Sequence, residues 1–303
     1  MEIPSRKKIQ PMKPIDLHVH STCSDGTFSP RELVDYAIQK GLAAFALTDH
    51  DTVDGLEEAI SYAESLRQQE TAGADQVPEV IPGIEFSTQY QDTDIHILGL
   101  SIDFTQSAFR QALQAFVDSR IHRNRKMCHL LTKAGIPVSY EDLLREFPGA
   151  VITRAHYAAY LLSHGYVHSR AEAFARYVGD HAPCFVPRQK VTPAQAVHLV
   201  LQAGGIPVLA HPILYHFSDT RLEDLTASLA AEGLMAIEAI YSTYNAREER
   251  LMRQLAARYH LLLCGGSDFH GTNKPGLDMG CGYGRLFVPY TVLEELKTAR
   301  KSL

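Results

Sequence analysis

The stretch PIDLHVHSTCSDGTFSP, residues 14–30, combines a short apolar strand with residue types that bind metals. Its apolar residues alternate with polar ones, which is the two-residue period of a β-strand. His18 and His20 therefore fall on the same face of that strand, and Asp25 follows in an Asp-Gly turn. We expect the apolar side chains to share the opposite face. That face would comprise Ile15, Leu17 and Val19.

The segments that follow this stretch predict alternating strands and helices. A helix should begin at Ser29 as N-cap, with Pro30 in its first turn and Glu32 closing a capping box. It should end at Gly41, a residue type common after the last helical turn. The alternation is typical of βαβ units in a parallel sheet. Further strands are expected at 43–48, 79–87 and 94–102, with a helix at 54–69.

The alternation stops at about residue 106. A long helical pattern covers residues 107–133, and helical stretches continue to about residue 177 without a strand pattern. Strands and helices alternate again after a capping signature that begins at Thr192. The later strands, which bring the total to seven or eight, are expected within 204–212, 234–242, 259–271 and 285–290.

Length and composition fit an α/β barrel that carries an inserted unit. The chain has 303 residues, of which 45% are hydrophobic and 21% charged, the composition of an ordinary globular protein. Barrels of β/α units reach this length as one domain. We predict a barrel domain from residues 1–105 and 190–303, and an all-helical insertion at 106–189 that would cap the substrate.

Several classes of protein are disfavoured by composition. A net charge of -6 argues against a broad nucleic-acid-binding face, although a local basic pocket is compatible with it. The five cysteines are scattered without a C-x-x-C pair, which favours reduced thiols. The first residues lack the apolar core of a signal peptide, and no apolar run is long enough to cross a membrane. We expect a cytoplasmic protein with no membrane association and no obligate protein partner.

Metal-binding residue types recur where the predicted strands end. The carboxyl ends of parallel barrel strands converge on one active site. Imidazole and carboxylate ligands suit Zn, Mn and Fe, and the absence of cysteine ligands argues against a structural zinc site. A catalytic zinc uses about three protein ligands, so nine candidates suggest two or three ions. The candidates are His18, His20, Asp25, His50, Glu85, His96, His211, Asp268 and His270.

The chain resembles the PHP (polymerase and histidinol phosphatase) family of metallohydrolases. The resemblance implies a distorted (β/α)7 barrel, similar to a TIM barrel, with an all-helical insertion domain. It also implies a trinuclear site, for which we expect two to three divalent ions, Mn first and Fe or Zn as alternatives. Six motifs carry the resemblance, in the family's order: DLHVHSTCSDG (16–26), LTDHDTVDG (47–55), PGIEFS (82–87), IHILGL (95–100), LAHP (209–212) and GSDFHG (266–271).

The same resemblance implies how the nine candidates divide among three ions. Glu85 would bridge the first and the second ion. Asp268 is expected to orient or deprotonate the attacking water, while Asp25, His211 or a bound water would protonate the leaving group. Asp51 and Asp54 are interpreted as turn or cap residues outside the site. The three ligand sets would be His18, His20, Glu85 and Asp268; Glu85, His96 and His211; and Asp25, His50 and His270.

The predicted insertion narrows the resemblance to one group of relatives. Residues 151–187 are similar to the insertion of PHP phosphatases that act on nucleoside 3',5'-bisphosphates, some of which also shorten RNA from its 5' end. The resemblance implies phosphate contacts there, and an ordinary helix start capped by Thr153 is the alternative. The basic stretch RIHRNRK (120–126) offers weaker contacts and also fits a solvated helix face. The candidate substrate contacts are Arg154, His156, Arg123 and Asn124.

These patterns predict a metal-dependent phosphoesterase. We expect it to hydrolyse a phosphomonoester of a small nucleotide, foremost a nucleoside 3',5'-bisphosphate, to a 5'-nucleotide and phosphate. Short 5'-phosphorylated RNA is a second expected substrate, degraded from its 5' end. A phosphodiesterase acting on phosphoribosyl cyclic phosphate is an alternative with the same metal site. A non-catalytic metal-binding module is the alternative from another class, and the complete ligand set argues against it.

Overall fold

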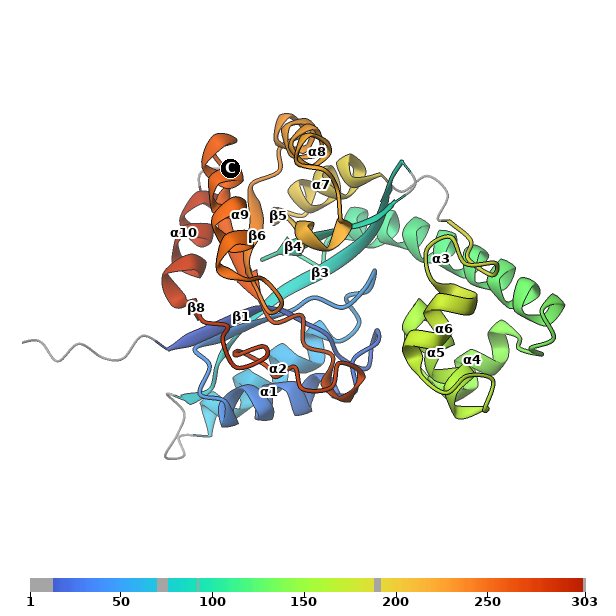
Figure 1. Cartoon of the computed structure of the whole chain (residues 1–303). Coiled ribbons are helices and arrows are strands. Elements are labelled where there is room, and N and C mark those ends of the chain that lie inside the picture. The colour runs from blue at the N-terminus through green and yellow to red at the C-terminus, as the bar shows by residue number, and fades with distance from the viewer. Residues whose placement is uncertain (1–12, 70–75, 92, 188–191, 302–303) are drawn as a thin grey trace, which may run out of the picture.

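The computed structural model describes residues 13–69, 76–91, 93–187 and 192–301. Within these residues, eight strands form one mixed sheet in the order β7-β6-β5-β4-β3-β2-β1-β8 (Figure 1). Four neighbouring pairs run parallel and three run antiparallel. The strands are β1 (Pro14–Val19), β2 (Ala44–Leu47), β3 (Glu79–Tyr90), β4 (Thr93–Leu100), β5 (Ile206–Leu209), β6 (Ala236–Tyr241), β7 (Leu262–Gly266) and β8 (Val288–Pro289).

Helices surround this sheet and extend from one side of it. In Figure 1, α1 and α2 lie on one flank of the sheet, and α7, α8, α9 and α10 lie on the other. Those six helices are α1 (Pro30–Gln39), α2 (Leu56–Gln68), α7 (Pro193–Gln202), α8 (Asp219–Ala231), α9 (Ala246–Arg258) and α10 (Tyr290–Arg300). The helices between β4 and α7 are α3 (Ser107–Lys133), α4 (Tyr140–Glu146), α5 (Arg154–Ser163), α6 (Arg170–Ala173) and the π-helix η2 (Phe174–Val178).

Helix α1 confirms the predicted capping box. The Ser29 hydroxyl accepts the backbone N–H of Glu32 at 3.3 Å, and the Glu32 carboxylate accepts the backbone N–H of Ser29 at 2.7 Å. These two bonds satisfy backbone donors that a helix start otherwise leaves unpaired. The observed boundaries of α1 and of α3 both lie within two residues of the predicted ones.

The sheet curls into a nearly closed barrel, as the sequence predicts. Residues beyond β7 return to β1, because the Phe269 N–H donates to the His18 carbonyl at 3.3 Å and the Phe269 carbonyl accepts the His20 N–H at 2.9 Å. Gly266 permits this approach: a Cβ there would lie 2.5 Å from the Cβ of His18. A glycine in a strand commonly marks such close contact between backbones.

Strand β4 contradicts the predicted parallel order. It pairs antiparallel with β3 on one side and with β5 on the other. Tyr90 and Thr93 are partners in the β3–β4 ladder, and the connection between them is too short for the crossover that a parallel pair needs. Glu85 accordingly lies in the middle of a long β3, whereas the sequence interpretation placed it at a strand end.

Strand β1 also departs from the predicted division of its faces. Ile15 and Leu17 pack in a cluster of strand side chains that α10 covers, whereas Val19 packs in the cluster beneath the outer helices. The register of β1 against β2 shifts between Asp16 and Val19. Such a bulge re-aims the side chains that follow it. The alternation seen in the sequence therefore does not continue through the strand: Val19 does not share the cluster of Leu17, and His18 contacts Glu85.

The helical segment has a hydrophobic core of its own. Buried side chains from Met127 to Cys184 form a cluster separate from the two clusters of the barrel. We keep the division into barrel and insertion as a proposal, because its expected boundary near residue 189 and both chain ends lie outside the described residues. No helix in the described part of the chain has both the length and the apolar character needed to cross a membrane.

Candidate metal centre

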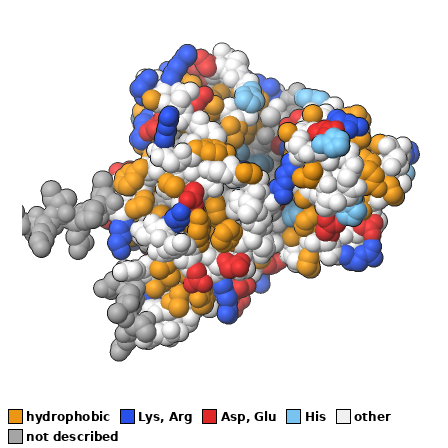
Figure 2. Space-filling model, turned by 60° about the horizontal axis from the view of Figure 1, so that its bottom comes forward, with side chains coloured by type: hydrophobic (Ala, Val, Ile, Leu, Met, Phe, Trp, Pro, Cys, Tyr) orange, Lys and Arg blue, Asp and Glu red, His pale blue; other side chains and the backbone are white. Residues whose placement is uncertain are grey.

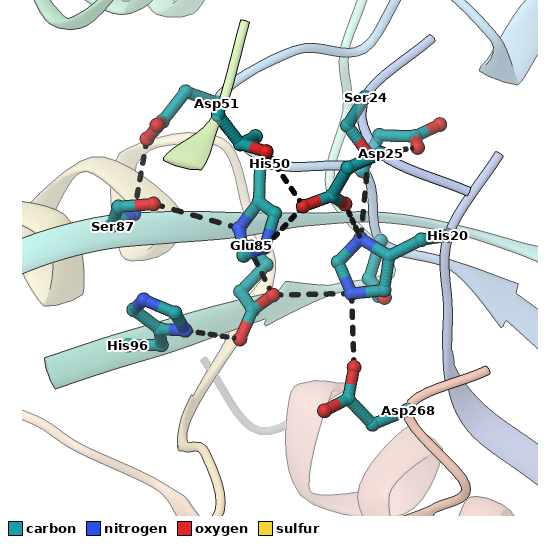
Figure 3. Close-up of polar contacts among 12 residues, drawn as sticks. His20, Ser24, Asp25, His50, Asp51, Glu85, Ser87, His96 and Asp268 are labelled. Carbon is teal, nitrogen blue, oxygen red and sulfur yellow. Dashed lines mark hydrogen bonds and ion pairs between the residues drawn. The ribbon is translucent and has the colours of Figure 1, made fainter. Parts of the chain in front are cut away.

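Glu85 lies at the centre of the polar cluster inside the barrel. Its carboxylate oxygens lie 2.8 to 3.3 Å from nitrogen atoms of five imidazoles, and its side chain is 1% exposed. Figure 3 shows Glu85 among three of these histidines, His20, His50 and His96. The five histidines come from the ends of β1, β2 and β5 and from β4. One carboxylate thus contacts side chains from four separate segments, as a bridging ligand would. The histidines are His18, His20, His50, His96 and His211.

Two further carboxylates close the cluster on the side of His270. Asp25 Oδ1 lies 3.1 Å from His270 Nε2, and Asp25 Oδ2 lies 3.8 Å from His50 Nε2. Asp268 Oδ1 lies 3.2 Å from His270 Nδ1 and 3.4 Å from His20 Nε2. All nine residues predicted as ligands therefore meet in one place, and eight of them are buried, His96 being partly exposed.

The donor set fits more than one metal ion. Among the described residues, the buried atoms His18 Nε2, His20 Nε2, His211 Nδ1 and Asp25 Oδ1 have no hydrogen-bond partner. Buried polar atoms are rarely left in this state unless an ion or a ligand satisfies them. Ligand atoms come within 4.8 Å of one another in four overlapping groups. These are His20, Asp25, His50 and His270; His18, His211 and Asp268; His18, His20 and Glu85; and His50, Glu85 and His96.

Carboxylates and imidazoles within the cluster shift one another's pKa values in opposite directions. Burial raises the pKa of Glu85, but the neighbouring imidazoles of His50 and His96 outweigh it and hold that pKa well below its usual range. Burial lowers the pKa of His20, while its contacts with Asp268 and Glu85 raise it to about 9. A ligand imidazole must be neutral, so ion binding at this site releases protons.

Side chains outside the nine hold the ligands in place. His18 Nδ1 lies 3.0 Å from Glu238 Oε1, which leaves the other ring nitrogen directed at the cluster. The second Glu238 oxygen accepts the backbone N–H of His211 at 2.8 Å. Carboxylates in this position orient a ligand histidine and fix its tautomer. Glu238 stands inside the predicted strand 234–242, and the sequence offered no signal that separated it from other strand residues.

Asp268 has two partners that the sequence analysis missed. Its Oδ2 accepts the Tyr241 hydroxyl at 2.6 Å and the Lys274 ammonium at 2.5 Å. Burial raises the pKa of Asp268, but the Lys274 and His18 charges outweigh this and keep it well below its usual range. Asp268 is therefore a carboxylate with one oxygen held in place and the other facing the histidines.

The stretch RIHRNRK divides into two sets of side chains: His122, Arg125 and Lys126 are exposed, as expected of a solvated helix face, whereas Arg120 is not. Arg120, Arg123 and Asn124 are all buried on α3. The Arg120 guanidinium pairs with the buried carboxylate of Asp51 and donates to the Ser87 hydroxyl at 2.8 Å. That carboxylate in turn accepts the Ser87 N–H at 3.0 Å, so Asp51 is a turn residue that also ties α3 to the strand beside the site.

We expect Arg120→Met to lower the free energy of unfolding by about 3–5 kcal/mol, because it leaves the Asp51 carboxylate buried without its partner. Chemical denaturation followed by circular dichroism measures this change. Arg145→Met is the matched control: it breaks an exposed pair with Asp142 on α4 and should cost less than about 1 kcal/mol. Equal effects of the two substitutions would contradict the structural role given to Arg120.

The cluster forms the floor of a cavity of about 530 Å³ between the barrel and the helical segment. Figure 2 shows the hollow between these two parts of the surface, with Lys or Arg side chains on the edge of the helical part. Arg123 and Arg154 line this cavity, as do Arg170 and Phe174, which the sequence analysis did not single out. The volume is that of a small-molecule site.

The predicted substrate contacts divide into two groups. Arg154 Nη2 lies 3.2 Å from Asp94 on β4, and its Nη1 donates to Asp180 at 2.7 Å. His156 and Asn124 do not line the cavity. His156 Nδ1 accepts the Thr153 N–H at 2.9 Å, as part of the helix cap that was the alternative reading. Of the four predicted substrate contacts, the structure therefore brings Arg154 and Arg123 to the cavity.

Comparison with known proteins agrees with this geometry. The profile of the PHP domain matches residues 16–182. A 5'-3' exoribonuclease from Escherichia coli strain K12 is 34% identical over 255 residues, which cover 84% of this chain and 84% of that protein. A 3',5'-nucleoside bisphosphate phosphatase from Chromobacterium violaceum is 32% identical over 270 residues, with 89% and 91% covered.

A solved structure extends the likeness to the whole fold. A protein from Bifidobacterium adolescentis, assigned as a metal-dependent phosphoesterase, superposes with a TM-score of 0.80 at 27% identity. The superposition covers 96% of this chain and 97% of the other. Sequence and fold therefore point to the same group of proteins.

Proposed function

This chain belongs to the PHP domain family and is a metal-dependent phosphoesterase, and we propose that it hydrolyses the phosphomonoester of a nucleoside 3',5'-bisphosphate. The observation that carries the proposal is the cavity itself. Its floor is the cluster around Glu85, and its walls include Arg123, Arg154 and Arg170. A ligand with one phosphate at the floor and a second anionic group at the wall would contact both the cluster around Glu85 and the arginines.

The floor would hold two to three divalent ions, for which we propose Mn first, with Fe and Zn as alternatives accepted by the same ligand set. We propose the three ligand sets that the family resemblance implies, with Glu85 shared between two ions. The nine side chains present only nitrogen and oxygen atoms, which supports this choice. Bound ions would neutralise charge on the phosphoryl oxygens and lower the pKa of a coordinated water.

The chain's own residues would position the water and the leaving group. Asp268 presents a carboxylate oxygen to the cluster while Tyr241 and Lys274 hold the other, which suits a group that orients or deprotonates a water. Asp25 and His211 border the cavity and are the candidates for protonating the leaving oxygen. The Thr153 hydroxyl donates to Asp25 at 2.9 Å and so links the first turn of α5 to the site.

The helical segment would cap the substrate from the side opposite the ions. Arg154 stacks over the rings of Phe185 and Phe174 at 5.3 and 6.0 Å and pairs with two aspartates. An arginine fixed in this way can bind a phosphate through two parallel hydrogen bonds. We propose that Arg154 and Arg123 contact the second phosphate of the nucleotide substrate. We also propose that the protein is cytoplasmic.

We expect purified, Mn-loaded protein to release phosphate from adenosine 3',5'-bisphosphate and to leave the 5'-nucleotide. Chromatography of the product separates 5'-AMP from 3'-AMP and so reports which ester is cleaved. Bis-p-nitrophenyl phosphate and phosphoribosyl 1,2-cyclic phosphate serve as phosphodiester comparisons. Faster turnover of the cyclic phosphodiester would overturn the bisphosphate assignment, and full metal occupancy without hydrolysis would favour the non-catalytic alternative.

Short RNA is a second candidate substrate that one comparison favours. The chain is 34% identical to a 5'-3' exoribonuclease over most of both lengths. Single-nucleotide steps from the 5' end of a 5'-phosphorylated oligonucleotide would support this activity. Cleavage at internal positions, which would give fragments of mixed length from the start of the reaction, would contradict it.

A further inference from the structure

The catalytic cavity is too small for more than a terminal part of an RNA chain. Its volume of about 530 Å³ lies within the range of small-ligand pockets. The rest of an RNA substrate must therefore leave the cavity and cross the protein surface. Because an RNA carries one negative charge per nucleotide, its path should be marked by basic side chains.

A second cavity is lined mainly by basic side chains of α3. It measures about 410 Å³, and His122, Arg125, Lys126 and His129 line it together with Leu130 and Val186. These four polar residues are exposed and follow the spacing of one helix face. We call this set, His122, Arg125, Lys126 and His129, the basic face of α3.

One hydrogen bond links a residue of the first cavity to a residue of the second. Arg123 lines the catalytic cavity, and its Nε donates at 2.7 Å to the carbonyl of Val186, which lines the second cavity. Lys126 stands three residues after Arg123 and is its neighbour along the helix surface. Phe185 adds an aromatic ring at this junction, with the Arg123 guanidinium 5.6 Å from its centroid. A basic groove with an aromatic ring is a usual arrangement for single-stranded nucleic acid.

Charge on this part of α3 is positive and largely uncompensated. From Ser119 to its end at Lys133 the helix carries no acidic residue. Arg125 has one exposed partner, Glu141 at 3.6 Å, and a pair of that kind is weak in water. Within the described residues, Lys126 has neither an ion pair nor a hydrogen bond from its side chain. The chain as a whole has a net charge of -6, so this face differs in sign from the rest.

We propose that the basic face of α3 binds the phosphate backbone of single-stranded RNA whose 5'-terminal nucleotide occupies the catalytic cavity. This inference rests on the proposed phosphoesterase function and adds to it a surface outside the active site. It gives the protein a way to bind an oligonucleotide more tightly than a mononucleotide without further base contacts. The same face should not affect a substrate that fits within the cavity.

The test is the double substitution Arg125→Gln/Lys126→Gln in the full-length protein. Arg247→Gln/Arg250→Gln is the matched control, because it also removes two exposed positive charges from one helix, α9, away from both cavities. Fluorescence anisotropy measures binding of a labelled, 5'-phosphorylated ten-nucleotide RNA across a salt series. Phosphate release from adenosine 3',5'-bisphosphate measures the catalytic site separately.

We expect the Arg125/Lys126 variant to bind the RNA about tenfold more weakly. The slope of the logarithm of its binding constant against the logarithm of salt concentration should become shallower by about 1.4, which is about 0.7 for each phosphate contact removed. Its turnover of the bisphosphate should equal that of the unsubstituted protein. The control variant should match the unsubstituted protein in both measurements. A DNA oligonucleotide of the same sequence shows whether backbone charge alone suffices, and equal weakening for DNA supports the backbone contact.

Several outcomes would overturn the inference. They are unchanged RNA affinity in the variant, an equal loss in the control, and an equal loss of bisphosphate turnover. Vesicles containing phosphatidylserine provide a further arm: binding that depends on the same two residues, with RNA binding unchanged, would assign this face to a membrane surface. If the RNA result holds but no bisphosphate is hydrolysed, the proposed function fails and the RNA-binding face stands.

Discussion

Substituting Glu85 by Gln should lower kcat by about 10³-fold or more and reduce the bound metal. Glu85 is the one carboxylate that contacts five imidazoles, so every ion shared between those imidazoles depends on it. An amide keeps the shape of the side chain but removes the negative charge that a bridging ligand supplies. Metal ions contribute several kcal/mol of charge stabilisation to such reactions, which corresponds to about a thousandfold in rate.

The measurement combines metal analysis with steady-state kinetics on the bisphosphate. Glu79→Gln is the matched control, because Glu79 lies on the same strand β3 but pairs with Lys297 on α10. That control should keep its metal and its turnover. A Glu85→Gln protein with full metal content and near-normal kcat would contradict the bridging role.

Substituting Asp268 by Asn should lower kcat by about 10² to 10⁴-fold with little change in KM and with the fold retained. The amide still fits beside Tyr241 and Lys274 but has no charge with which to orient or accept a proton from a water. A factor of this size is typical of losing a general base. His18→Ala should abolish phosphate release as well, through loss of metal from the barrel floor.

Circular dichroism, metal analysis and single-turnover kinetics separate the two effects. Asp224→Asn on α8 is the control, an exposed aspartate outside the cavity. Recovery of the Asp268→Asn rate in excess Mn would mean that Asp268 acts only through metal binding. Robust turnover by either Asp268→Asn or His18→Ala would refute the proposed mechanism.

Local signals predicted most of the helices and the identity of the cluster. The capping residues around Ser29 and Thr192 determine helix starts within a few residues, and such signals act through neighbours in the sequence. The nine candidate ligands were identifiable because imidazole and carboxylate on buried strands have few structural uses. Their convergence in the barrel agrees with that expectation.

Other features depended on contacts between distant segments. Glu238, Tyr241 and Lys274 support the cluster, yet each belongs to a residue type that is common in strands and loops. Arg120 and Asp51 are 69 residues apart, and their pairing follows from where α3 crosses the barrel. A single sequence carries no signal for such a pair, so it does not predict that Arg120 is buried while His122 and Arg125 are exposed.

The types of the candidate ligands, their order along the chain and the helical segment after β4 can all be predicted from the sequence. The direction of β4, the register shift in β1 and the place of Glu85 between five histidines emerge only in the folded chain. The two groups of features differ in the range of the interactions that set them. Capping and periodicity are set by residues a few positions apart, whereas strand direction and the meeting of side chains are set by packing between distant segments.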